Sequence, residues 1–108
     1  MKIAIAMQEG NVNSRIDKHF GKCAFFFILD DENGKSEIIE NPGNTIKGCK
    51  ADVIVNALAK KNVSKIIAGD FGSNVQQILN KRQIQMIINP DENVTVLDIT
   101  SLLRSKSR

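Results

Sequence analysis

The sequence contains no tryptophan and no tyrosine, and it has only one histidine, two cysteines and two prolines. Two cysteines cannot form a framework of several disulfides, so the fold must depend on an ordinary hydrophobic core, for which 108 residues are enough. No apolar run approaches the length of a membrane span, and the short run at the N-terminus lacks a signal-peptide cleavage site. We therefore expect a cytoplasmic protein, away from membranes, with one domain over residues 1–103 and a basic tail over 104–108.

The charge pattern and the absence of known catalytic motifs argue against two classes of function, nucleic-acid binding and enzymatic catalysis. The net charge is +3, and several basic residues stand in the C-terminal tail. A nucleic-acid-binding surface usually combines a basic stripe with stacking aromatic residues or a known motif, and neither is present. The chain has no P-loop, no nucleophile elbow and no zinc quartet, and it lacks the converging carboxylates of two-metal hydrolysis. We expect no nucleic-acid partner and no enzymatic activity, with a phosphate-ester hydrolase as the least favoured alternative.

Hydrophobic patterning predicts five strands and three helices in the order β-β-β-α-β-α-β-α. The predicted strands cover residues 2–7, 23–30, 35–41, 63–69 and 84–88, and the predicted helices cover 51–61, 73–82 and 93–103. Ser73 and Asn93 are expected to cap helices, and Asn62 should adopt a left-handed conformation after the first helix. A hairpin followed by right-handed crossovers gives one five-stranded mixed sheet with flanking helices, an α/β domain of the ribonuclease H-like kind.

This topology brings several loops to one edge of the sheet. Strands one, three, four and five should end there, and strand two should begin there. The four loops expected to meet are 8–23, 42–50, 69–74 and 89–93. His19 and Cys23 stand in the first of these loops and Cys49 in the second, so all the soft metal ligands of the chain are predicted at the edge where α/β proteins bind ligands.

An imidazole and two thiols are ligands that iron, iron–sulfur clusters, copper and zinc select. Three such ligands cannot complete a four-cysteine cluster site. They could hold a preformed cluster loosely or share a metal with a second subunit. Gly48 and Gly72 each precede a predicted helix, where free N–H groups and the helix dipole favour anions. Because many metal–sulfur clusters are anionic, the two expectations agree.

Each candidate residue also has a purely structural interpretation. A histidine before a phenylalanine, as at His19, is often a turn or packing residue. Cys23 could be a small buried hydrophobic residue at the start of a strand. Cys49 stands at a predicted helix start, a position that favours a reactive or metal-binding thiolate. Phe20 and Phe71 are expected to belong to the core rather than to contact a ligand.

Four segments together resemble the dinitrogenase iron–molybdenum cofactor biosynthesis family, the group that contains NifX, NafY and the carboxyl-terminal domain of NifB. They are MKIAIAM, HFGKCAFFFI, ENPGNTIKGCKADVIVNAL and VSKIIAGDFGSNVQQIL. The resemblance covers roughly residues 1 to 100. The most specific parts are H-F-G after a long first loop, a glycine-containing segment before the first helix, and A-G-x-x-G-x-N after the fourth strand.

The resemblance implies a ribonuclease H-like fold without nuclease activity. It also implies transient binding of an iron–sulfur or iron–molybdenum-type cluster, and transfer to or from a cluster donor or acceptor protein. It makes His19 a candidate cluster ligand and Cys49 the second, with help from Cys23. Gly72 and Asn74 would offer backbone or amide contacts to the anion. We expect a monomer or a weak dimer. The alternative is a metal-free interaction or regulatory module on the same fold.

Overall fold

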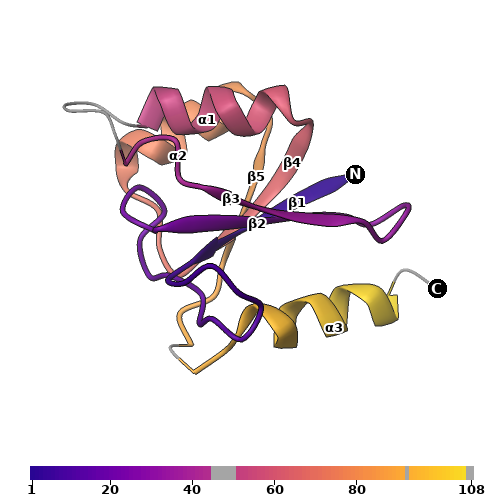
Figure 1. The fold of residues 1–108 in the computed structure, drawn as a ribbon. Helices are drawn as coiled ribbons and strands as arrows, with labels where there is room; N and C mark the ends of the chain where they lie inside the picture. Colours follow the sequence, from indigo (N-terminus) through magenta and orange to yellow (C-terminus); the bar gives the residue numbers. More distant parts are fainter. Residues whose placement is uncertain (45–50, 92, 107–108) are drawn as a thin grey trace.

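A computed structural model describes residues 1–44, 51–91 and 93–106, and within them one mixed sheet of five strands packs against three helices (Figure 1). The strands are β1 (Lys2–Met7), β2 (Phe25–Asp30), β3 (Ser36–Glu40), β4 (Val63–Ala68) and β5 (Gln85–Ile88), and the helices are α1 (Ala51–Lys60), α2 (Ser73–Lys81) and α3 (Val96–Lys106). The predicted α/β class with a five-stranded mixed sheet is confirmed. Helix α3 continues through residues 104–106, so part of the predicted tail is helical.

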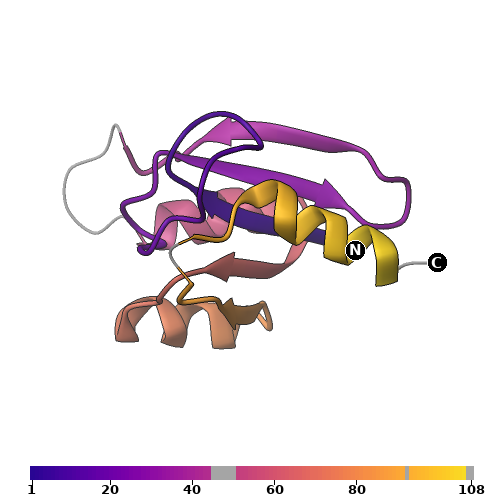
Figure 2. The ribbon, with the colours of Figure 1, turned by 90° about the horizontal axis from the view of Figure 1, so that it is seen from below.

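The strands lie side by side in the order β3-β2-β1-β4-β5. Strand β2 pairs antiparallel with both β1 and β3, while β4 pairs parallel with both β1 and β5. Helices α1 and α2 cover one face of the sheet, and α3 crosses the opposite face, as the view from below shows (Figures 1 and 2). The carboxyl ends of β1, β3, β4 and β5 therefore lie at one edge, as the sequence predicts.

Strand β1 is apolar throughout because both of its faces are covered. Ile3, Ile5 and Met7 pack in the core between the sheet and α3, which we call the α3 core. Ala4 and Ala6 pack in the core under α1 and α2, which we call the α1–α2 core. The small alanine side chains let α1 and α2 approach this face closely. The larger side chains of Ile3, Ile5 and Met7 fill the space between the sheet and α3.

Two segment ends differ from the sequence prediction. Strand β2 begins at Phe25 rather than at Cys23, because Cys23 closes a turn with its thiol 3.3 Å from the carbonyl oxygen of Phe20. The predicted cap at Ser73 is wrong, since Gly72 is the N-cap of α2 and has extended backbone angles (φ −63°, ψ 156°) without a side-chain cap. At the end of α1, Asn62 has φ 65°, so the predicted left-handed residue is confirmed.

The start of α3 also differs from the prediction. The backbone N–H of Asp98 donates to the hydroxyl of Thr95 (3.2 Å), and the N–H of Thr95 donates to the carboxylate of Asp98 (3.0 Å). This reciprocal pair is a capping box, so Thr95, not Asn93, caps the helix. No helix within the described part of the chain is long and apolar enough to cross a membrane.

Candidate functional site

The first loop, residues 8–24 between β1 and β2, divides into two halves at Ile16. In the first half, the buried hydroxyl of Ser14 accepts hydrogen bonds from the backbone N–H groups of Gln8 (3.1 Å) and Glu9 (2.9 Å). The carbonyl of Ser14 accepts from the N–H of Val96 (2.9 Å), and the carbonyl of Val12 accepts from that of Leu97 (2.9 Å). This half therefore folds back on itself and supplies acceptors for the first N–H groups of α3, which lack partners within the helix.

The second half of the first loop runs between the ends of two neighbouring strands. The N–H of Asp17 donates to the carbonyl of Ala6 at the end of β1 (2.8 Å), and the N–H of Gly69 after β4 donates to the carbonyl of Asp17 (3.0 Å). His19 and Asp70 then pair as a short parallel bridge. The predicted convergence of loops 8–23 and 69–74 is therefore confirmed, and a chain of backbone hydrogen bonds fixes the contact.

Gly69 is required by the closeness of this contact. A Cβ atom at Gly69 would lie 2.7 Å from the Cα of Lys18, a backbone atom that cannot move away without shifting the loop. The glycine in A-G-D-F-G thus permits one backbone segment to lie directly against another. The separation of the two loops, and with it the place of His19, depends on this residue.

His19 is exposed at the surface of this edge. Its backbone N–H donates to a carboxylate oxygen of Asp17 (2.9 Å), which closes a local turn and fixes the backbone at that point. Asp70 stands beside it across the bridge, with one carboxylate oxygen 2.8 Å from the N–H of Phe71. The backbone is held on both sides while the imidazole faces solvent, an arrangement that leaves a ring nitrogen accessible to a ligand.

Three phenylalanine rings support this edge from below. The ring of Phe20 lies 5.5 Å from that of Phe26 and 5.7 Å from that of Phe71, measured between centroids. All three are buried members of the α1–α2 core. The prediction that Phe20 and Phe71 belong to the core is confirmed. They anchor the two segments that carry His19 and Asp70 to the same hydrophobic cluster.

Cys23 lies beneath the surface rather than on it. Its side chain is fully buried, its thiol donates to the carbonyl of Phe20 (3.3 Å), and the amide of Asn41 donates to the sulfur (3.6 Å). Burial, assisted by the negative charge of Asp17, raises the pKa of the Cys23 thiol to about 12. The thiol is therefore neutral near pH 7, and the small-hydrophobe interpretation describes its surroundings.

Asn41 connects the beginning of the second loop to the first, a role that the sequence analysis missed. Its side-chain amide donates to the carbonyl of Cys23 (2.9 Å), and its side-chain oxygen accepts from the N–H of Gly43 (2.9 Å). The residue is buried, and all of its buried polar atoms have partners. The available signal was a polar residue directly before Pro42-Gly43 at the end of a strand. These bonds hold the start of loop 42–50 against the His19 loop.

The remaining predicted residues lie partly inside and partly outside the described part of the chain. Gly72 and Asn74 lie at the start of α2, directly after Asp70 and Phe71, so the structure places them at the predicted edge. Gly48 and Cys49 lie outside the described residues. Within residues 1–44, 51–91 and 93–106, no group of three or more His, Cys, Asp or Glu side chains could hold a metal ion. The described part therefore presents His19, with the N-terminus of α2 nearby, and not a complete ligand set.

Comparison with known proteins identifies the family of the chain. The family model described as dinitrogenase iron-molybdenum cofactor matches residues 1–104. An uncharacterized protein of Methanocaldococcus jannaschii is 36% identical over 89 residues, which is 80% of this chain and 72% of the relative.

Solved structures share the fold. The apo form of the orange protein from Desulfovibrio gigas matches with a TM-score of 0.84 at 20% identity, over 98% of this chain and 88% of that one. A Thermotoga protein provisionally assigned as NifB matches with a TM-score of 0.73 at 26% identity, over 95% and 89% of the two chains.

Proposed function

The chain belongs to the dinitrogenase iron-molybdenum cofactor family, and we propose that it is a non-enzymatic carrier that binds an iron–sulfur or iron–molybdenum-type cluster as its cargo. The observation that carries the proposal is the position of His19, an exposed imidazole on a backbone fixed between the ends of β1 and β4. Imidazole is a ligand that iron accepts readily. A ligand held in this way is available to an arriving cluster without a rearrangement of the loop.

The N-terminus of α2 supplies a second favourable element. The N–H of Gln76 donates to the carbonyl of Gly72 (3.0 Å) and forms the first hydrogen bond of the helix. Amide groups before this point, including that of Asn74, lie at the positive end of the helix dipole, where an anion is stabilised. The bridge between His19 and Asp70 brings this helix end to the same edge, so an anionic cluster at His19 would lie in a favourable field.

We propose Cys49 as the second protein ligand on the strength of the sequence pattern. Cys23 is not part of the ligand set that we propose. Its thiol is buried and hydrogen-bonded, and its raised pKa opposes the thiolate that a metal requires. Two protein ligands form an incomplete coordination shell. Such a site suits a cargo that a cytoplasmic donor protein delivers and an acceptor protein removes.

We further propose that the fold is of the ribonuclease H-like kind, used here without hydrolysis. The support is the sheet order, in which an antiparallel three-stranded part joins two parallel crossover units. Among the described residues, no carboxylates converge in the way that two-metal hydrolysis needs. The function we favour therefore uses the edge of the sheet for binding and release.

Anaerobic reconstitution with iron and sulfide tests the carrier function. The wild-type protein should develop visible charge-transfer absorption, and iron should remain with the protein through gel filtration. His19→Ala and Cys49→Ala should each lose most of this absorption. Cys23→Ala is the matched control, because it removes a thiol that lies beneath the site, and it should retain the absorption once it is shown to be folded.

Equal binding by the wild type, His19→Ala and Cys49→Ala would show that the proposed site is wrong. Retention by those two variants with loss in a folded Cys23→Ala would instead move the site to the buried thiol. If protein purified without oxygen contains no metal and cannot be reconstituted, the alternative of a metal-free interaction module is favoured.

A further inference from the structure

Strand β3 is an outer strand of the sheet, with β2 on one side and no strand of the described part of the chain on the other (Figure 2). The N–H of Asn41 after β3 donates to the carbonyl of Ala24 (3.0 Å), and the carbonyl of Lys35 before β3 accepts from the N–H of Asp30 (2.9 Å). Main-chain groups alternate in direction along an antiparallel pair. Every second residue between these two bonds therefore directs its N–H and C=O away from β2, and these residues are Ser36, Ile38 and Glu40.

The outward main-chain groups of these three residues form what we call the β3 edge. None of them has a hydrogen-bond partner in the part of the chain that the structure describes. The side chain of Ile38 is also 39% exposed, and it lies on the α3 side of the sheet because it is paired with Phe27 of the α3 core. An unpaired strand with an uncovered apolar side chain is a template on which another strand can pair.

A second copy of the chain matches the β3 edge through a two-fold axis at Ile38. In the antiparallel pair formed in this way, Ile38 lies opposite Ile38 of the second copy, and Ser36 lies opposite Glu40 of the second copy. Every residue with outward main-chain groups then meets another such residue, and each of these pairs can exchange two hydrogen bonds. The hydroxyl of Ser36 can donate to the opposite carboxylate, and the two isoleucine side chains cover each other.

The side chains of the strand select this register over the neighbouring ones. The next register in one direction places Glu37 opposite Glu37 of the second copy, where like charges are destabilising. The next register in the other direction places Ser36 opposite Pro42, which has no N–H to donate. In the register centred on Ile38, no glutamate lies directly opposite another, and Glu37 keeps its ion pair with Lys61 (2.8 Å).

We propose that two copies of the chain form a weak dimer through the β3 edge, with the two β3 strands antiparallel and the two sheets joined into one. The free main-chain groups, the exposed isoleucine and the charges of this edge all fit a second copy in one register. A single pair of short strands buries little surface, so the dimer should dissociate readily on dilution. An extended segment of another protein at the same edge would instead leave the chain monomeric by itself.

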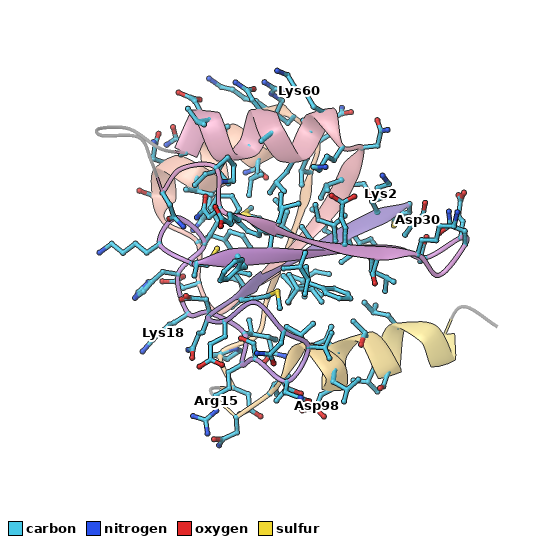
Figure 3. The ribbon with its side chains drawn as sticks, viewed as in Figure 1. Lys2, Arg15, Lys18, Asp30, Lys60 and Asp98 are labelled. Carbon is cyan, nitrogen blue, oxygen red and sulfur yellow. The ribbon has the colours of Figure 1, made fainter. Side chains whose placement is uncertain are left out.

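The dimer keeps the two proposed cluster sites apart. Strand β3 ends at the edge that carries His19, whereas Asp30, at the turn before β3, and Lys18, next to His19, lie at opposite ends of the molecule (Figure 3). Antiparallel pairing reverses the direction of β3 in the second copy. The two His19 edges therefore face opposite ways, and this contact does not give two copies one shared cluster. Dimerisation can thus be measured independently of cluster binding.

Sedimentation equilibrium of the metal-free protein at a series of concentrations tests the proposal. The wild type should show a reversible equilibrium between monomer and dimer. Ile38→Lys sets two like charges opposite each other at the axis and should weaken Kd by about tenfold or more. Ile88→Lys is the matched control, because Ile88 is an exposed isoleucine on β5, the strand at the other side of the sheet. It should leave Kd unchanged, and circular dichroism checks that both variants are folded.

Ser36→Lys tests the register by a gain of affinity. It brings a lysine opposite Glu40 of the second copy at both symmetric positions and should tighten Kd by about fivefold. The neighbouring registers do not form this pair. His19→Ala should dimerise normally, which separates this result from the cluster test. The proposal is overturned if the wild type stays monomeric up to its solubility limit, if Ile38→Lys and Ile88→Lys give the same Kd, or if Ser36→Lys does not tighten the dimer.

Discussion

The two halves of the first loop, which joins β1 to β2, have opposite roles although they adjoin in sequence. In the first half, the side chain of Ser14 is turned inward and its hydrogen bonds connect the loop to itself. In the second half, the backbone around His19 makes the connections and the side chain faces outward. The comparison teaches that one long loop can bury one polar side chain for its own structure and leave another exposed on a fixed backbone, where we propose that it binds.

The largest expected effect on stability comes from removing the hydrophobic support of the second half of the first loop. Phe20→Ala should lower the free energy of unfolding by about 3–5 kcal/mol, because it empties a fully packed position between two other rings. Denaturant titration measures the loss. A decrease below about 1 kcal/mol would mean that the two segments meeting at His19 are not held by this cluster.

The pH dependence of stability probes the layer just beneath His19. The Cys23 thiol has an ordinary pKa of 9.0 and about 12 when folded, so its contribution to stability is complete below pH 9 and is lost as pH rises toward 12. Unfolding measured in this range should show a steeper decline for Cys49→Ser than for Cys49→Ser with Cys23→Ala. Parallel curves would place Cys23 at the surface instead.

The first half is tested by Ser14→Ala, which removes an acceptor from two backbone N–H groups. The N–H of Glu9 would then lose this acceptor, and the N–H of Gln8 would keep only the carbonyl of Arg15 (3.3 Å), so the change should cost about 1–3 kcal/mol in unfolding free energy. Cluster binding by the folded variant should not change, since the backbone at His19 is held by other bonds. Loss of binding in a stable Ser14→Ala protein would show that the halves are coupled.

The smallest expected effect on stability is that of His19→Ala. An exposed side chain should change the unfolding free energy by no more than about 0.5 kcal/mol. Lys22→Ala, an exposed change in the same loop, is the matched control. Both should melt like the wild type, while only His19→Ala should lose the cargo. A large destabilisation by His19→Ala would mean that the imidazole has a structural role.

The sequence was sufficient for features that depend on local pattern and handedness. Strand β1 (Lys2–Met7) has the predicted bounds because its apolar run is bordered by polar residues. The convergence of the His19 loop with residues 69–74 followed from strand direction alone, because crossovers are right-handed. The Thr95-x-x-Asp98 capping box was also readable in the sequence but was missed.

Other features could not be predicted because they depend on packing and hydrogen bonds that exist only in the folded protein. The residues around Ser14 do not indicate that it is buried, and Pro42-Gly43 after Asn41 marks only the end of a strand. The burial of both residues is compensated by hydrogen bonds formed only in the folded protein. The same holds for Cys23, whose sequence position is equally consistent with a ligand and with a core residue. Three-dimensional packing places Cys23 in the core, which favours the second interpretation.

The close approach of Gly69 to Lys18 also determines when the edge around His19 can form during synthesis of the protein. The bond from Gly69 to Asp17 joins segments that are far apart in the chain, so the ribosome completes the His19 loop long before its partner exists. Contacts of this kind form late, after the intervening chain has folded. A nascent chain therefore cannot form the finished edge around His19 until β4 has been made and docked.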